Sequence, residues 1–389
     1  MDVSMTINKQ TARVGFYLLR PFHHAMLDSI YAQLKDELNC LITDDYAKLV
    51  VYQPHILVSA DMFHSKLRGL LPNTITIMVG HGGIAGKNYS KELIAWSDFY
   101  CFASECVKNF CFERQWFPRL GYWVVGITST DRLFQQTTLQ LIDCFKSESI
   151  LNSSKTLLYA PTFTPKINAI DVVKIEGIQQ IRRQFPELNI IIKLHPLTAK
   201  LSSDWIKSYQ ALAQQDEKIY FANMDDNISD YMHLADILLS DVSSVMFHFL
   251  HFNRPLILVN NPQRFENKQR FAADSFAWQW RDMGIEVETI PQLVTAIQRT
   301  LENPQEKEQQ RLHYKQLLFG NMLDGQASTR IANKIKALIT PQFEDEAWVT
   351  VAWNSLRMFS RYEQQIYQLE HSAFALKNPY HTFKIITRD

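Results

Sequence analysis

Short apolar runs alternate with stretches of helical apolar spacing along most of the chain. Apolar runs bounded by turn residues predict buried strands, and the stretches between them predict amphipathic helices. Strands that alternate with helices favour parallel sheets covered by helices on both faces. The predicted strands fall into two sets: residues 14–19, 56–59, 74–79, 99–102 and 122–126, then residues 156–159, 190–194, 219–222, 237–239 and 256–259.

These two sets of strands predict two domains. A chain of 389 residues is longer than a single hydrophobic core usually supports. A polar linker at residues 152–154 separates the sets. We therefore expect an α/β protein in which two Rossmann-like, doubly wound parallel-sheet domains, residues 1–152 and 153–335, face each other across a cleft. The aromatic-rich residues 336–389 are expected to form a helical tail that packs back on the body.

Composition excludes several classes of protein. Lys plus Arg equals Asp plus Glu at 40 each, so no net charge favours nucleic-acid binding. Residues 1–12 lack the pattern of a secretory signal, and no apolar run is long enough to span a membrane, so we expect a cytoplasmic protein. The five cysteines match neither a disulfide framework nor a zinc spacing. We expect no metal and no cofactor.

Residues 235–247 contain the most informative turn. The apolar strand at 237–239 runs into the polar residues Ser240 and Asp241, and a helix is expected to open at Ser243 or Ser244. The first N–H groups of a helix lack internal acceptors and attract anions, here the phosphates of a nucleotide-activated donor. Serine is also a common helix cap, so both interpretations stay open.

Polar side chains follow several other predicted strands. In parallel α/β sheets, ligands bind outside the carboxyl ends of the strands. The chemically capable residues at these positions are expected to line the cleft: His81 and Lys87 from the first half, and Thr162, Lys193, His195, Asp241, Ser243 and Ser244 from the second.

The glycine-rich run that begins at Gly80 needs separate treatment. Its Gly-x-Gly-x-x-Ala spacing matches a dinucleotide fingerprint, but it follows a later strand and lacks the acidic residue expected after the next one. It is not a P-loop either, because Lys87 precedes Asn88 rather than Ser or Thr. We expect these glycines to turn the backbone tightly and present His81 to the cleft.

Several motifs together resemble the CDP-glycerol glycerophosphotransferase family, which builds teichoic-acid and related capsule polymers. Two further segments, residues 252–257 and 324–328, are similar to that family as well. The motifs that carry the resemblance are Gly80-His81-Gly82 with Lys87, Tyr159-Ala160-Pro161-Thr162, Lys193-Leu194-His195-Pro196 and Ser240-Asp241-Val242-Ser243-Ser244-Val245-Met246-Phe247.

The resemblance implies a GT-B fold and a CDP-activated polyol donor. It also implies transfer of glycerol-phosphate or ribitol-phosphate to a hydroxyl of a glycan or lipid-linked acceptor, with release of CMP and a peripheral contact with the inner membrane face. His81 and His195 correspond to the family's two functional histidines. The chain departs from the family at Phe163-Thr164, where an aromatic-Arg pair is common.

Roles for the cleft residues follow from this chemistry. His81 is expected to be the base for the acceptor hydroxyl, with Gly82 and Lys87 beside it on the acceptor side. His195 and the donor-binding set of Thr162, Lys193, Asp241, Ser243 and Ser244 would stabilise the phosphates as CMP leaves. Two alternatives stay open: a GT-B glycosyltransferase that uses a nucleotide sugar, and a non-catalytic binding protein.

Overall fold

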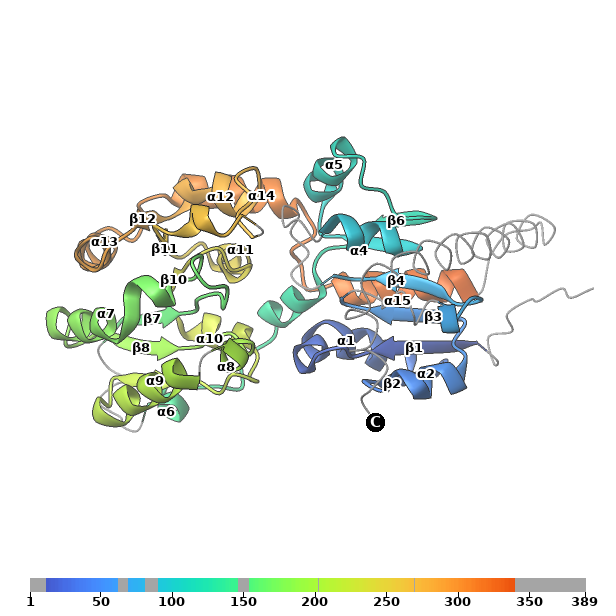
Figure 1. The fold of residues 1–389 in the computed structure, drawn as a ribbon, viewed down its shortest axis with the longest axis horizontal. Helices are drawn as coiled ribbons and strands as arrows, with labels where there is room; N and C mark the ends of the chain where they lie inside the picture. Colours follow the sequence, from blue (N-terminus) through green and yellow to red (C-terminus); the bar gives the residue numbers. More distant parts are fainter. Residues whose placement is uncertain are drawn as a thin grey trace, which may run out of the picture.

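The computed structural model describes residues 12–61, 69–80, 90–145, 154–201, 203–268 and 270–339. Within these ranges, the strands form two separate six-stranded sheets (Figure 1). The first sheet contains β1 (Arg13–Tyr17), β2 (Asn39–Thr43), β3 (Ile56–Ser59), β4 (Ile75–Met78), β5 (Phe99–Phe102) and β6 (Gly121–Val124). The second contains β7 (Thr156–Tyr159), β8 (Asn189–Ile192), β9 (Ile219–Phe221), β10 (Ile237–Ser240), β11 (Leu256–Val259) and β12 (Ile285–Val287).

Helices connect and cover these strands. Around the first sheet lie η1 (Pro21–His23), α1 (His24–Leu34), α2 (Tyr46–Tyr52), α4 (Ser90–Trp96) and α5 (Glu105–Glu113), and η2 (Thr128–Phe134) and α6 (Leu141–Cys144) lead to the second half. Around the second sheet lie α7 (Ile170–Gln184), α8 (Thr198–Leu201), α9 (Ser203–Gln215), α10 (Ile228–Leu234), α11 (Val245–His248), η4 (Phe249–Phe252), η5 (Arg264–Glu266), α12 (Phe276–Gln279), η6 (Arg281–Met283) and α13 (Ile290–Glu302). The described chain ends with α14 (Glu308–Phe319) and α15 (Ala327–Ile339).

Strand order creates an opening at the carboxyl edge of each sheet. Neighbouring strands pair in parallel, in the orders β2-β1-β3-β4-β5-β6 and β12-β11-β10-β7-β8-β9. In the second sheet the chain moves outward from β7 to β9 and then crosses back to β10. The switch point therefore lies between β7 and β10, where ligands bind in open α/β sheets. The predicted fold class, with two doubly wound parallel sheets, is confirmed.

Two strands were not predicted from the sequence. The helix α1 ends at Leu34, and β2 begins at Asn39. Both β2 and β12 are sheet edges. Only Thr43 is buried in β2, so this strand lacks the continuous apolar run that marked the central strands. Edge strands face solvent on one side, which weakens the sequence pattern used to predict them.

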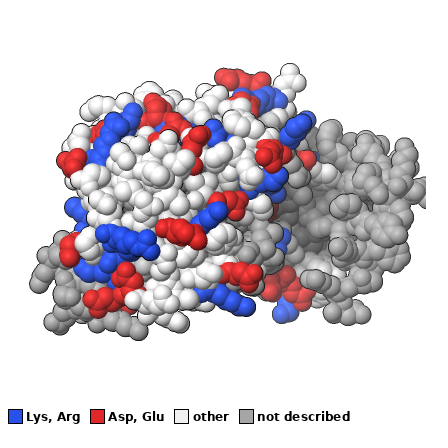
Figure 2. Space-filling view, turned by 60° about the vertical axis from the view of Figure 1, so that its left-hand side comes forward, with Lys and Arg blue, Asp and Glu red and all other residues white. Residues whose placement is uncertain are grey.

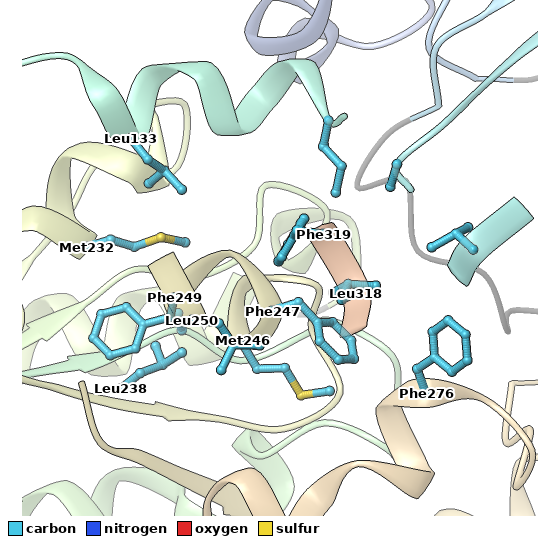
Figure 3. Packing of buried hydrophobic residues seen from close by; sticks show 14 of the residues in the cluster. Leu133, Met232, Leu238, Met246, Phe247, Phe249, Leu250, Phe276, Leu318 and Phe319 are labelled. Carbon is cyan, nitrogen blue, oxygen red and sulfur yellow. The ribbon is translucent and has the colours of Figure 1, made fainter. Parts of the chain in front are cut away.

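The hydrophobic core joins the two halves. One cluster of buried side chains packs around the first sheet, and a second packs around the second sheet. A third cluster contains residues of both halves. In the third cluster, the rings of Phe110 on α5 and Phe276 on α12 are 4.6 Å apart. Figure 3 shows Leu133 of η2 facing Met232 of α10 in the same cluster. The halves are therefore packed against each other through apolar side chains.

The chain returns to the first sheet after completing the second. The helix α15 packs against α1, and its buried face includes Ile331 and Ile335 in the core of the first half (Figure 1). The predicted domain limit at 335/336 falls inside this helix, and the limit at 152/153 lies outside the described residues. The limits of the two domains and the packing of the 336–389 tail stay predictions.

A buried carboxylate fixes this return. Asp131 in η2 accepts the N–H groups of Ala327 at 3.0 Å and Ser328 at 2.8 Å, although these residues lie almost 200 positions away. The side chain thereby caps α15 from a different element. Gly126 makes the close approach possible: its φ is +91°, and a Cβ there would lie 2.7 Å from the carbonyl oxygen of Met322. The two connections between the halves are thus tied together.

Replacing Asp131 should destabilise the whole chain. The substitution Asp131→Ala leaves two buried N–H groups without acceptors, and we expect the free energy of unfolding to fall by about 2–4 kcal/mol. Urea denaturation followed by circular dichroism measures this change. Asp45→Ala, which removes a surface cap within the single helix α2, is the control and should cost about 1 kcal/mol. Equal losses in both variants would contradict the interlocking role.

Candidate active site

A cavity of about 420 Å³ lies between the two halves. Its first-half wall comes from η1, α1 and η2, and its second-half wall comes from the loops that follow β7, β8, β9 and β10. Four of the predicted site residues line it: Lys193, His195, Ser243 and Ser244. The cavity thus lies at the switch point of the second sheet.

The predicted residue Asp241 lies behind the cavity wall rather than in it. Its side chain is fully buried, and its carboxylate accepts the N–H groups of Thr162 at 2.9 Å, Ala169 at 2.7 Å and Val242 at 2.7 Å. Burial raises the pKa of this carboxyl, and the hydrogen bonds from the same three N–H groups oppose the shift. Asp241 therefore holds the loop after β7 against the turn after β10.

The scaffold continues through Arg281, which is 4% exposed. Its guanidinium donates to the backbone carbonyls of Asp241 at 2.8 Å and Val259 at 3.2 Å. Burial lowers the pKa of Arg281 to about 10, so the group stays charged at neutral pH. The turn after β10 is fixed from both sides, which orients the serines that follow it.

Ser243 and Ser244 line the cavity at the start of α11. Ser244 occupies the helix cap position, but its side chain makes no capping hydrogen bond. Two corrections to the sequence interpretation follow. The N–H groups of Val242 and Ser243 donate to Asp241, so an anion would meet N–H groups only from Ser244 onward. The helix has four residues before it tightens into η4, so its dipole is weaker than expected.

Lys193 is a buried cation in the cavity wall. It follows β8, is 5% exposed, and donates from Nζ to the carbonyl oxygen of Met224 at 2.7 Å. Burial lowers its pKa to about 8, and the charges of Asp226 and Asp225 oppose the shift. Within the described part of the chain Lys193 forms no direct ion pair, although Asp225 and Asp226 line the same cavity and their charges act on its Nζ. A bound anion would supply the missing partner.

His195 lies where the two halves meet. Its Nδ1 accepts the N–H of Leu197 at 3.1 Å, so the neutral ring carries its proton on Nε2. The ring centre is 4.6 Å from that of Phe163 and 6.1 Å from that of Phe22 in the first half. These contacts fix the imidazole as a hydrogen-bond donor through Nε2.

The predicted acceptor-side residues His81, Gly82 and Lys87 lie outside the described residues. Thr162 lies in the loop after β7 and donates its N–H to Asp241, but it is not among the residues that line the cavity. The roles assigned to all of these residues stay predictions.

The cavity also contains residues that the sequence did not indicate. Arg132 in η2 forms a bidentate pair with Asp230, with nitrogen–oxygen distances of 2.9 and 2.7 Å. On the same first-half wall, in α1, Nδ1 of His24 lies 2.9 Å from Oδ1 of Asp28. No motif marked these residues, because they reach the site only through the packing of one half on the other.

Neither a metal site nor a membrane-spanning helix is found in the described part of the chain. There, no group of three or more His, Cys, Asp or Glu side chains is arranged to hold a metal ion. No described helix is both long and apolar enough to cross a membrane. On the face shown in Figure 2, Lys and Arg are interspersed with Asp and Glu.

Comparison with known proteins agrees with this geometry. A family profile described as "CDP-Glycerol:Poly(glycerophosphate) glycerophosphotransferase" matches residues 79–337. The teichoic acid glycerol-phosphate primase of Bacillus subtilis (strain 168) is 27% identical over 158 residues, which cover 39% of this chain and 36% of that protein. The teichoic acid ribitol-phosphate polymerase TarL of Staphylococcus aureus (strain NCTC 8325 / PS 47) is 26% identical over 141 residues, covering 34% and 23%. The matched stretches thus span about a third or less of these relatives.

Solved structures share the fold at low identity. The wall teichoic acid polymerase TagF aligns over 88% of this chain and 92% of that one, with a TM-score of 0.62 and 14% identity. The UDP-GlcNAc 2-epimerase of Neisseria meningitidis aligns over 84% and 99%, with a TM-score of 0.52 and 13% identity. The two facing parallel sheets with a cavity between them define the GT-B class of α/β proteins. Within that class, this chain belongs to the CDP-glycerol glycerophosphotransferase family.

Replacing Asp241 should destabilise the turn and loop that form the wall behind the cavity. In Asp241→Asn, the amide nitrogen faces N–H groups that need acceptors, so we expect the free energy of unfolding to fall by about 2–5 kcal/mol. Thermal and urea unfolding measure the change. Asp274→Asn is the control, because the side chain of Asp274 is 61% exposed beside Arg114 and should change stability by under about 1 kcal/mol. If the free energy of unfolding were unchanged in Asp241→Asn, the structural role of Asp241 in the cavity wall would be contradicted.

The pKa of Lys193 predicts how anion binding depends on pH. The amine is charged below about pH 8 and loses its proton as the pH rises further, so affinity for a diphosphate such as inorganic pyrophosphate should fall between pH 7 and 10. Isothermal titration calorimetry across this range measures the slope. In Lys193→Met the affinity should be lower at pH 7 and nearly independent of pH. A wild-type affinity that stays constant to pH 10 would remove Lys193 from the anion site.

Proposed function

We propose that this chain transfers a polyol phosphate, glycerol-phosphate or ribitol-phosphate, from a CDP-activated donor to a hydroxyl of a glycan or lipid-linked acceptor of the teichoic-acid or capsule type. Membership of the family supports this chemistry, and one observation carries it: the buried Lys193 lines the same cavity as His195 and the two serines. Cationic and N–H or O–H donors gathered in one wall suit a diphosphate.

The bond changes follow from the donor. The acceptor oxygen attacks the phosphorus that bears the polyol, and the bond from this phosphorus to the bridging oxygen breaks. CMP leaves with that oxygen, and the acceptor proton passes to a base, for which we propose His81. Lys193, the Nε2–H of His195 and the hydroxyls of Ser243 and Ser244 would stabilise the charge on the leaving phosphate.

The proposal also gives roles to the remaining predicted residues and a location to the enzyme. Gly82 and Lys87 are proposed beside His81 on the acceptor side. Thr162 and Asp241 would contribute to donor binding by shaping the loop and the turn, since the carboxylate of Asp241 is engaged with backbone N–H groups. We also propose a cytoplasmic enzyme that meets a lipid-linked acceptor by peripheral contact at the inner membrane face. The five cysteines, all of which are free, are compatible with this compartment.

Product analysis tests the reaction class. The full chain is incubated with an acceptor polyol phosphate and, in separate reactions, CDP-glycerol, CDP-ribitol and common nucleotide sugars. We expect CMP to accumulate one-for-one with a phosphodiester product from a CDP-polyol. Release of CDP or UDP with transfer of an unphosphorylated group would identify a glycosyltransferase and overturn the proposal. The absence of any turnover would favour a binding protein.

Replacing His195, in the loop after β8, should slow the release of CMP. His195→Ala removes a donor from the leaving phosphate, and we expect the rate of CMP release to fall about 10²-fold or more, by analogy with the loss of one oxyanion donor. His313→Ala is the control, because His313 is exposed on α14 and does not line the cavity. Equal rates in the two variants would exclude His195 from the chemical step.

A further inference from the structure

Three polar side chains in the cavity wall have buried atoms without hydrogen-bond partners. These atoms are Oγ1 of Thr128, Oγ of Ser129 and Nε2 of His248. Thr128 is 4% exposed and His248 is 6% exposed. Thr128 and Ser129 begin η2 on the first-half side, whereas His248 ends α11 on the second-half side. We call these three residues the neutral polar cluster.

Burial without a partner is unfavourable for such groups. Each unpaired hydroxyl or ring nitrogen costs about 1–3 kcal/mol relative to a paired one. Isolated cases occur elsewhere, as at Thr300 on α13, so a single unpaired atom indicates little. The cluster differs because its three members, from two different elements, line one cavity. Each of these atoms is closed to water, so a molecule in the cavity becomes its partner only when the side chain turns toward that molecule.

The chemistry of the cluster selects an uncharged partner. Burial lowers the pKa of His248 to about 4, so its imidazole is neutral at pH 7 and offers one donor and one acceptor. The hydroxyls of Thr128 and Ser129 also donate and accept. Neutral groups of this kind pair with hydroxyls, whereas a phosphate is better served by the charged Lys193 in the same wall.

One member of the cluster, His248, lies close to the proposed phosphate site at Ser244. The backbone N–H of His248 donates to the carbonyl oxygen of Ser244 at 3.2 Å, so the two residues are one helical turn apart. Four residues of helix rise about 6 Å, which is comparable to the length of a short polyol chain. A polyol joined to a phosphate at Ser244 would therefore reach the level of His248.

We propose that Thr128, Ser129 and His248 bind the hydroxyls of the polyol that is transferred. This inference rests on the proposed function, since it names the site for one part of its donor. The cluster then distinguishes a polyol-bearing donor from the bare nucleotide, and it completes the hydrogen bonds that the protein leaves unmade. Because η2 and α11 belong to different halves, polyol binding also requires the packing of the halves described above.

Comparing CDP-glycerol with CDP isolates the polyol contribution. Isothermal titration calorimetry is performed on the full chain and on Thr128→Val, which replaces the hydroxyl with a methyl of similar size. We expect affinity for CDP-glycerol to fall about 3- to 10-fold and affinity for CDP to stay within twofold. Thr128→Ser keeps a hydroxyl and should restore binding. Thr300→Val is the matched control, because it removes an equally buried unpaired hydroxyl outside the cavity.

Other outcomes overturn the inference in distinguishable ways. An equal loss for CDP and CDP-glycerol would assign the cluster to the nucleotide, and no loss for either ligand would mean that the cluster does not contact the donor. A wild-type chain that binds neither ligand would refute the proposed function and this inference with it. Ser129→Ala repeats the comparison independently if Thr128→Val unfolds, which its thermal midpoint would reveal.

Discussion

The carboxylate of Asp241 is the interaction on which the site depends. It is fully buried, and it gathers backbone N–H groups from the loop after β7 and from the turn after β10. A charge in this position is stable only because these donors surround it. The same contacts close the back of the switch point and leave Lys193, His195 and the two serines facing a cavity. Asp241 thus contributes to function by building the wall.

A second carboxylate has the same role at the scale of the whole chain. Asp131 ties η2 to the start of α15, so the segment that leaves the first sheet and the segment that returns to it are fixed together. Apolar contacts such as Phe110 with Phe276 also hold the halves together. The cavity borders the first of these attachments, because Arg132, the neighbour of Asp131 in η2, lines it. Its walls come from both sheets, so its shape depends on the packing of the halves.

The sequence predicted those parts that follow from local pattern. Central strands such as β8 and β10 are continuous buried runs, so the residues after them, including Lys193 and His195, could be placed at one sheet edge. The edge strands β2 and β12 lack that run and were missed. Phe22 and Thr128 could not be found, because they reach the cavity only through the packing of one half on the other. The assignment of Asp241 to the donor did not anticipate that backbone N–H groups occupy its carboxylate.

The central claim is that this cavity holds the donor diphosphate between the two sheets. An experimental structure of the full chain with CDP-glycerol tests it most directly. We expect the diphosphate within hydrogen-bond distance of Lys193, of Nε2 of His195 and of Ser244, with the polyol toward His248. A donor bound elsewhere on the chain, or in the cavity with its phosphates away from Lys193 and Ser244, would contradict the account.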